Sequence, residues 1–162
     1  TNKYYNIKML KRSLILVIFL LATSCGYESI YSKKNSIDYN FSISTINFEG
    51  DRDVNLKIKQ KFNNYIQNKK NKEFRLNVKS VSERLILAKD LSGDPTSFKS
   101  TTTTYVNVFA KNNLKNTFKI KKSVKYNNIS NKFELKNFEK ELKINLAETI
   151  ADELIFKLSS VQ

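Results

Sequence analysis

The sequence has no histidine and no tryptophan, and its 162 residues include one cysteine, one proline and three glycines. Without histidine, the chain cannot build a Ser-His-Asp or Cys-His nucleophile, nor a zinc site with histidine ligands. A single cysteine excludes an intrachain disulfide. The glycines, Gly26, Gly50 and Gly93, lie too far apart to form a phosphate-binding loop. These absences predict a protein that is not an enzyme and that uses no cofactor or metal ion.

The chain is strongly basic, with 29 Lys and Arg residues against 15 Asp and Glu residues and a formal net charge of +14. Such a charge favours an anionic partner, which is nucleic acid, a phospholipid headgroup or an acidic glycolipid. An AT-rich genome, however, also enriches any protein in Lys, Asn and Ile. The charge alone therefore does not identify the partner. Hydrophobic residues make up 40% of the chain, which is enough for one domain with its own core.

A short hydrophobic run lies near the start of the sequence. Leu14 to Ala22 is nine apolar residues long and follows the basic pair Lys11 and Arg12. Nine helical residues rise about 13 Å, which is less than half of the ~30 Å hydrocarbon core of a bilayer. The pattern therefore predicts a secretory signal peptide over residues 1–24 rather than a membrane-spanning helix.

The only cysteine, Cys25, comes directly after this run, in the stretch Ala-Thr-Ser-Cys. The stretch resembles the bacterial lipobox, in which the thiol receives diacylglycerol because the thioether forms on sulfur. An ordinary signal peptide with an incidental cysteine is the alternative, but the position of the sole cysteine favours lipidation. Gly26, where aspartate would favour retention in the inner membrane, resembles the default for outer-membrane sorting. Three acyl chains on Cys25 would give a stable anchor.

One domain is predicted over residues 41–160, after a lipidated N-terminus and tether over residues 25–40. Period-two alternation and helical spacing of apolar residues predict its elements. In order, these are a strand over 41–50, a helix over 51–70, strands over 73–81 and 83–90, a loop over 90–100, a strand over 101–110, a turn over 111–116, a strand over 117–130 and a helix from Asn137 onward. Asp51 or Asp53 is expected to cap the first helix, and Glu139 and Glu141 to lie in the first turn of the last one.

Each predicted strand has one apolar face, and each helix has one apolar stripe. The expected fold is therefore α+β: a two-layer α/β sandwich with two helices on one face of a mixed, mostly antiparallel sheet of four to five strands. The first strand, helix and second strand form a crossover, so some parallel pairing is expected. In the strand over 117–130, the polar face presents three lysines as a candidate anion-binding patch: Lys119, Lys121 and Lys125.

The order of these parts, together with the lipobox, resembles the LPS-assembly lipoprotein family, LptE. The resemblance covers residues 25 to about 160. Its motifs are the opening CGYESIY, the centre LNVKSVSERLILAKDLSGDPTSFKSTTTTYVNVFA and the closing helix NLAETIADELIFKL. Ser29 departs from the family pattern, because many members have proline at this place.

The resemblance implies an outer-membrane lipoprotein on the periplasmic side that plugs the lumen of the LptD barrel and helps to deliver lipopolysaccharide. It also implies two glycolipid contacts. Lys99, after Phe98, matches the family's aromatic–basic pair, and Lys136 matches a basic residue before the last helix. The alternative is that all five candidate lysines are solvated side chains in a Lys-rich protein, and for any single lysine this explanation is favoured. A single exposed ion pair contributes only about 0–1 kcal/mol, so only a cluster would matter.

Two other functions compete with this one. The first is an auxiliary periplasmic lipoprotein of a lipid-trafficking transporter, which the sequence does not separate from the LptE-like role. The second is nucleic-acid binding, which requires aromatic side chains on an exposed sheet face. The strand aromatics Phe74, Phe118 and Tyr126 instead share faces with aliphatic residues and are predicted to lie in the core. Together with the export signal, this argues against a nucleic-acid partner.

Overall fold

Four strands and two helices follow one another along residues 39–161, the part of the chain that the computed structural model describes. In chain order they are β1 (Ser42–Gly50), α2 (Arg52–Gln67), β2 (Glu73–Lys89), β3 (Pro95–Ala110), β4 (Asn113–Asn127) and α3 (Lys132–Ser159). The predicted signal peptide, Cys25 and nearly all of the tether lie outside the described residues. None of the helices within residues 39–161 is long and apolar enough to cross a bilayer.

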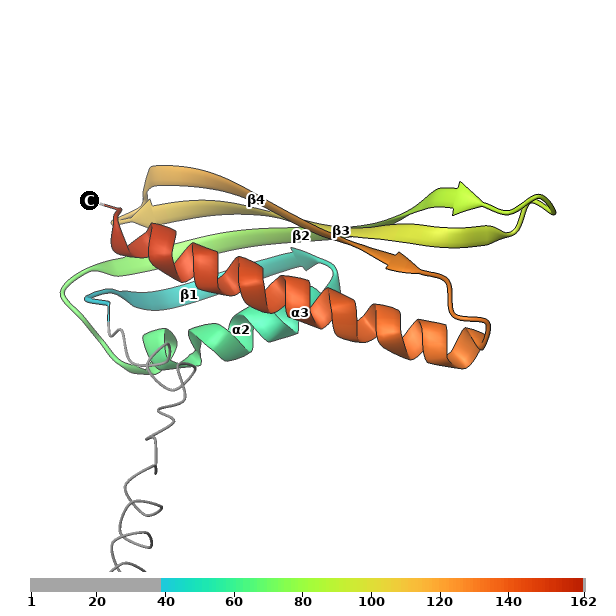
Figure 1. Ribbon diagram of the computed structural model, residues 1–162. Coiled ribbons are helices and arrows are strands. Elements are labelled where there is room, and N and C mark those ends of the chain that lie inside the picture. The colour runs from blue at the N-terminus through green and yellow to red at the C-terminus, as the bar shows by residue number, and fades with distance from the viewer. Residues whose placement is uncertain (1–38, 162) are drawn as a thin grey trace, which may run out of the picture. The chain divides into compact units, whose positions relative to one another are not determined.

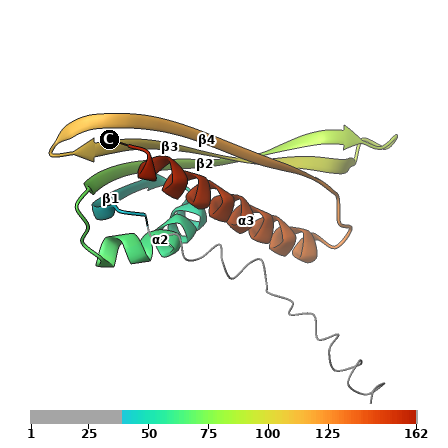
Figure 2. The ribbon, with the colours of Figure 1, turned by 60° about the vertical axis from the view of Figure 1, so that its left-hand side comes forward.

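The four strands form one sheet in the order β1-β2-β3-β4. β1 runs parallel to β2, whereas β2–β3 and β3–β4 are antiparallel. Both helices cover the same face of the sheet and leave the other face open (Figures 1 and 2). The α+β fold predicted from the sequence, with two helices on a mixed sheet, is thereby confirmed.

The core lies between the sheet and the helices. Phe74, Leu76 and Val78 alternate with exposed residues along β2 and are buried against both helices. In α3, the fully buried positions recur every three to four residues, which turns one side of the helix toward the sheet. Burying one such side chain contributes about 1.5–3 kcal/mol, so this alternation fixes which face of the sheet the helices cover.

β2 is one 17-residue strand, and the prediction of two separate strands is wrong. Its inward-facing serines are satisfied by threonines of β3: the hydroxyl oxygens of Ser80 and Thr104 are 3.1 Å apart, and those of Ser82 and Thr102 are 3.4 Å apart. Polar residues can therefore face inward without breaking the strand. As a result, β2 and β3 continue past the helices as a long hairpin (Figure 1).

The hairpin turn is also shorter than the loop predicted over residues 90–100. The carboxylate of Asp90 accepts hydrogen bonds from the backbone N–H groups of Ser92 and Asp94, both at 2.9 Å. Because this Asx turn closes the chain within five residues, β3 already begins at Pro95. Lys99 consequently lies within a strand and not in a loop.

Side-chain caps set where the helices begin. Of the two predicted candidates, Asp51 caps α2, with its carboxylate accepting from the backbone N–H groups of Asp53 and Val54. Asn131 caps α3 in the same way, so this helix begins five residues before the predicted Asn137. Two expectations are therefore wrong. Glu134, not Glu139 or Glu141, is the acidic residue of the first turn of α3, and Lys136 lies inside the helix rather than before it.

Candidate functional site on the uncovered sheet face

Four of the five predicted glycolipid-contact lysines lie on the sheet face that no helix covers. Lys99 of β3 follows the buried Phe98, and three lysines of β4 alternate with buried or half-buried apolar residues: Lys119, Lys121 and Lys125. Side chains alternate between the two faces of a strand, so these lysines point away from the helices. Lys79 of β2, which sequence analysis did not single out, shares this face. We call this set the cationic face: Lys79, Lys99, Lys119, Lys121 and Lys125.

Strand pairing places these lysines in register. Lys99 is the direct cross-strand partner of Lys125, and Tyr105 lies between Lys79 on one side and Lys119 on the other. The ammonium of Lys119 is 5.3 Å from the centre of the Tyr105 ring, a cation–π contact. Like charges directly opposite one another destabilise a sheet. An anion between Lys99 and Lys125 would remove this cost.

The carboxylates that form ion pairs with the basic side chains lie on the opposite, helical side. There, Glu148 binds Lys57 and Lys61, both at 3.0 Å, and Glu153 binds Lys122 of β4. The other pairs on this side are Lys61 with Asp152, Lys143 with Asp51 and Asp53, Arg84 with Glu139, and Lys157 with Glu153. Within residues 39–161, no lysine of the cationic face pairs with a carboxylate. The lysines of the cationic face are therefore not held in ion pairs within this part of the chain, although the exposed carboxylate of Glu49 lies on the same face, across from Lys79.

Two of these carboxylates, Glu148 and Asp51, have a lowered pKa. Hydrogen bonds from Lys61 and Lys57 lower the pKa of Glu148. Partial burial opposes ionisation of Asp51, but hydrogen bonds from the Val54 backbone, Ser82 and Lys143, together with the charge of Lys143, outweigh it and lower its pKa. Nowhere in residues 39–161 do three acidic or cysteine side chains gather closely enough to hold a metal ion.

Lys136 does not join the cationic face. It is exposed on α3, in the helical layer, whereas Lys99 projects from the other side of the sheet. Phe98, the aromatic member of the predicted aromatic–basic pair, is buried at 1% exposure. Its ring lies 5.5 Å from the ring of Tyr126, and the guanidinium of Arg84 stacks over it at 3.9 Å. Phe98 is thus a packing residue, and the two members of the pair face opposite ways.

A polar cluster that sequence analysis missed holds α3 against the base of the hairpin. The hydroxyl of Tyr126 donates to Glu139 Oε1 at 2.7 Å, and Arg84 Nε lies 3.2 Å from the same oxygen. Burial, followed by the hydrogen bond to Glu139, raises the pKa of Tyr126. These residues come from β2, β4 and α3, so no local pattern could reveal their contact. The cluster fixes the segment of β3 from which Lys99 projects.

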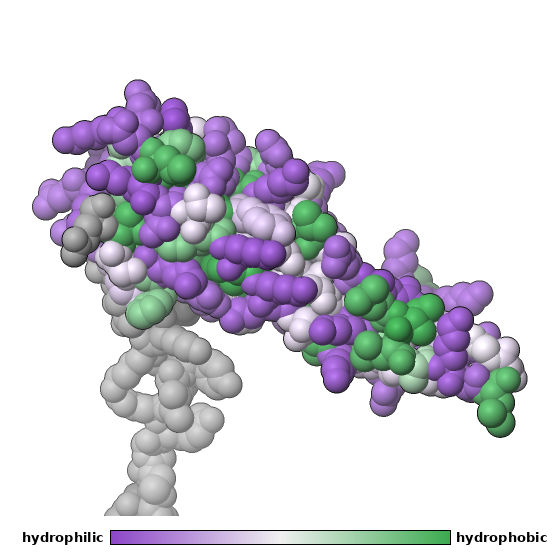
Figure 3. All heavy atoms as spheres, turned by 90° about the horizontal axis from the view of Figure 1, so that it is seen from above, coloured by the Kyte–Doolittle hydropathy of each residue, from purple (hydrophilic) through white to green (hydrophobic). Residues whose placement is uncertain are grey.

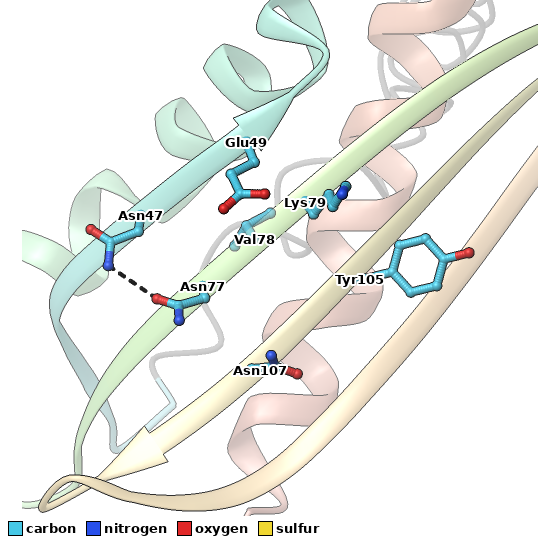
Figure 4. Close-up of a pocket in the computed structure, with 7 residues that line it drawn as sticks. All are labelled: Asn47, Glu49, Asn77, Val78, Lys79, Tyr105 and Asn107. Atoms are coloured by element: carbon cyan, nitrogen blue, oxygen red, sulfur yellow. Dashed lines mark hydrogen bonds between the residues drawn. The ribbon is translucent and has the colours of Figure 1, made fainter.

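A shallow pocket of about 330 Å³ lies on the uncovered face beside the lysines (Figure 4). Its lining comes from β1, β2 and β3: Asn47, Glu49, Asn77, Val78, Lys79, Tyr105 and Asn107. Asn47 Nδ2 donates to Asn77 Oδ1 at 3.0 Å, as the dashed line in Figure 4 shows. Asparagine is abundant throughout the chain, so the sequence alone did not mark these positions.

The hairpin carries a different surface. Viewed onto the uncovered face, polar side chains spread over the body of the sheet, while apolar ones gather toward the far end (Figure 3). Leu91 at the turn is fully exposed, and about half of the side chains of Leu85, Ile86 and Leu87 is exposed. The uncovered side of the molecule therefore combines a cationic body with an apolar extension.

No protein-family model matches the chain, and no curated protein is detectably similar to it in sequence. Solved structures do match. Rare lipoprotein B from Shewanella oneidensis has a TM-score of 0.58 at 13% identity, over 72% of this chain and 94% of that one. A minor lipoprotein from Acinetobacter baumannii has a TM-score of 0.58 at 13% identity, over 75% and 92%. A lipoprotein B from Nitrosomonas europaea has a TM-score of 0.58 at 12% identity, over 74% and 83%.

At these identities the likeness concerns the fold. The chain has the fold of these bacterial lipoproteins, and the match spans most of each chain. Rare lipoprotein B is of the LptE type, so the resemblance predicted from the sequence is confirmed at the level of the fold.

Proposed function

We propose that the protein is a non-catalytic outer-membrane lipoprotein that plugs an LptD-type β-barrel and assists delivery of lipopolysaccharide to the cell surface. The observation that carries the proposal is the set of five lysines on one face of a lipoprotein fold, which have no ion pairs within the described residues. The lipobox supports it independently, since acylated Cys25 would hold the domain at the membrane.

The chemistry of the cationic face suits this glycolipid. Lipopolysaccharide carries phosphate and carboxylate groups on its lipid A and inner sugars, and lysines bind these groups through charge-assisted hydrogen bonds. Lys99 and Lys125, which face each other across β3 and β4, would share one such anion. The threonines between the lysines keep the rest of the face polar, as the water-filled lumen of a barrel requires. Lys136 would contact the ligand from the helical layer, separately from this face.

The proposal is tested by purifying the tagged protein from detergent-solubilised outer membranes and titrating it with lipopolysaccharide. We expect a large β-barrel to co-purify and mass spectrometry to find acyl chains on Cys25. Co-purification of inner-membrane transporter subunits would instead establish the auxiliary-lipoprotein alternative.

The contact residues are tested with charge-reversal variants. We expect the double variant Lys99→Glu and Lys125→Glu to weaken lipopolysaccharide binding strongly. The matched control, Lys59→Glu with Lys140→Glu, changes the net charge equally on exposed helical positions and should leave the affinity nearly unchanged. Equal weakening by both pairs would show that only net charge matters. Lys136→Glu, measured separately, tests the remaining contact.

A further inference from the structure

We propose that the polar pocket on the uncovered sheet face binds an anionic saccharide. Residues of β1, β2 and β3 line the pocket (Figure 4). None of the five predicted contact lysines is among them. That this saccharide is the sugar portion of a glycolipid rests on the proposed function. The existence of a sugar site rests on the pocket itself.

Three amide side chains form a row across the pocket. Asn77 is the cross-strand partner of Asn47 on one side and of Asn107 on the other. Asn77 Oδ1 accepts from Asn47, and Asn107 Oδ1 accepts from the hydroxyl of Thr117, both at 3.0 Å. These bonds fix the orientation of both amides. Within the described residues the NH₂ groups of Asn77 and Asn107 have no acceptor, so both are oriented donors for a ligand.

The next row supplies the complementary groups. Glu49, Lys79 and Tyr105 lie side by side on β1, β2 and β3. No ion pair within residues 39–161 occupies Glu49 or Lys79, so the pocket offers a carboxylate acceptor and an ammonium donor. The Tyr105 side chain is 41% exposed and adds an aromatic ring at the edge.

This combination favours a sugar over other small ligands. Sugar hydroxyls both donate and accept hydrogen bonds, and therefore use oriented amides and a carboxylate together, while the C–H face of a sugar ring packs on an aromatic ring. A free phosphate has no C–H face to pack on Tyr105, and Glu49 would repel it. An apolar ligand would need apolar walls, yet the only aliphatic residue of the lining, Val78, has its side chain buried in the core on the other side of the sheet. The volume of about 330 Å³ is at the small end of ligand pockets, as a short saccharide requires.

The charge around the pocket selects an anionic saccharide. Lys119 contacts Tyr105 from β4, and Lys121 follows on the same face. Neither is neutralised by a carboxylate of the described domain. A phosphate or carboxylate on the saccharide would reach these lysines while the sugar hydroxyls occupy the amide row.

The test is calorimetric titration of the purified full chain with the deacylated oligosaccharide of lipopolysaccharide, which has no acyl chains. We expect saturable binding that weakens about tenfold or more in Asn77→Ala with Asn107→Ala, since a tenfold change corresponds to the loss of about one or two hydrogen bonds. The matched control, Asn137→Ala with Asn145→Ala, removes two exposed amides of α3 and should bind as the wild type does. Unchanged binding by the pocket variant would overturn the proposal.

Nuclear magnetic resonance locates the site without any substitution. In the wild type, the side-chain NH₂ resonances of Asn77 and Asn107 should shift on titration with the oligosaccharide, more than those of Asn137 and Asn145. Inorganic phosphate, titrated in parallel, should leave them unmoved. If phosphate alone reproduces the shifts, the pocket is an anion site and not a sugar site, and the proposal is wrong.

The outcome is separable from that of the proposed function. A wild-type protein that co-purifies with a barrel but does not bind the oligosaccharide refutes the sugar site alone. A protein that binds the oligosaccharide through Asn77 and Asn107 but brings down no barrel refutes the proposed function alone.

Discussion

Lys99 and Lys125 are direct cross-strand partners on β3 and β4, on the face that the helices leave open. The sequence places them 26 positions apart, and no carboxylate of residues 39–161 pairs with either. Two cations in this arrangement repel each other in the free protein. This repulsion lowers the stability of the free sheet, and a bound anion would offset it. The stability of the sheet would therefore depend on whether an anion is bound.

This link gives the first prediction. Lys125→Glu replaces a repulsive pair by an attractive one, so we expect the free energy of unfolding in urea to rise by about 0.2–1 kcal/mol. The affinity for lipopolysaccharide should fall in the same variant. Lys121→Glu is the control, because the cross-strand partner of Lys121 is Thr103 and no repulsion is relieved there. Equal stabilisation by both variants would contradict the pairwise explanation.

The contact between Tyr126 and Glu139 gives the second prediction. Tyr126→Phe keeps the ring packed against Phe98 but removes the 2.7 Å hydrogen bond to a charged acceptor. Hydrogen bonds to charged groups contribute about 1.5–3 kcal/mol, so we expect a loss of that order in urea unfolding. Tyr105→Phe removes an exposed hydroxyl and should cost almost nothing. If both variants lose the same stability, the hydroxyl of Tyr126 is not what holds α3 to the sheet.

The third prediction concerns acid. The pKa of Asp51 is lower in the folded protein than in the unfolded chain. Its ionised form therefore stabilises the fold fully above about pH 5, and this stabilisation is lost as the pH falls below about 4 and passes through the lowered pKa. Glu148 acts in the same direction. We expect the Tm to fall as the pH is lowered from about 6 to about 3.

Asp51→Asn isolates one contributor to this fall. Asparagine is as good an N-cap as aspartate, so the variant keeps the cap of α2 and loses the ion pair with Lys143. We expect a lower Tm than that of the wild type at pH 6 and a difference that shrinks toward pH 3, as measured by calorimetry. A difference independent of pH would mean that the charge of Asp51 contributes nothing to stability.

The sequence predicted the layers of this fold well, because the periods that define them are local. The alternation of Phe118, Ile120 and Tyr126 with lysines assigned the two faces of β4 before any contact was known. The wrong boundaries come from single side chains whose hydrogen bonds to the backbone start or end an element where the hydrophobic pattern does not. Asn131 starts α3 early, and Asp90 closes the hairpin turn early, so the predicted loop around Lys99 is part of a strand.

The candidate site was less predictable, because neighbouring lysines differ only in their distant partners. Lys121 and Lys122 are adjacent in β4, yet Lys122 turns toward α3 and pairs with Glu153, whereas Lys121 has no carboxylate partner in the described domain. Alternation alone shows that they point opposite ways. Which of the two is neutralised depends on Glu153, 31 residues after Lys122, and the two residues come together only in the folded state.

The free edge of β2 gives the fourth prediction. β1 pairs with β2 only as far as Ser80, and no strand of residues 39–161 lies beside β2 beyond that point. This edge carries exposed Leu85, Ile86 and Leu87, whereas the outer edge strand β4 is rich in lysine, which hinders edge-to-edge pairing. We therefore expect the purified protein to self-associate through the β2 edge at high concentration.

Leu85→Lys should suppress this self-association in light scattering and sedimentation. Leu114→Lys on β4 is the matched control, because the two leucines are 56% and 57% exposed and the charge change is identical. Equal suppression by both variants would indicate a general effect of net charge rather than pairing at the β2 edge.

The last prediction compares two glycines with nearly the same positive φ and different surroundings. Gly50 ends β1 at φ +86°, and Gly93 lies in the hairpin turn at φ +90°. A Cβ at Gly50 would lie 2.0 Å from the carbonyl oxygen of Ser80, whereas a Cβ at Gly93 would meet nothing within 4 Å. Both Ala variants incur the left-handed penalty of about 1–2 kcal/mol, so the difference between them isolates the close approach of β1 to β2.

We expect Gly50→Ala to lower the free energy of unfolding in urea by clearly more than Gly93→Ala does. The added methyl group must push Ser80 away, and the carbonyl oxygen of Ser80 also accepts the backbone N–H of Asp51 at 2.9 Å. Displacing it disturbs the residue that caps α2 and binds Lys143 of α3. If the Gly50→Ala variant does not fold while the Gly93→Ala variant does, the result agrees with the predicted order of the two stability losses. Equal losses in the two variants would show that the crossover from β1 to α2 does not depend on this contact.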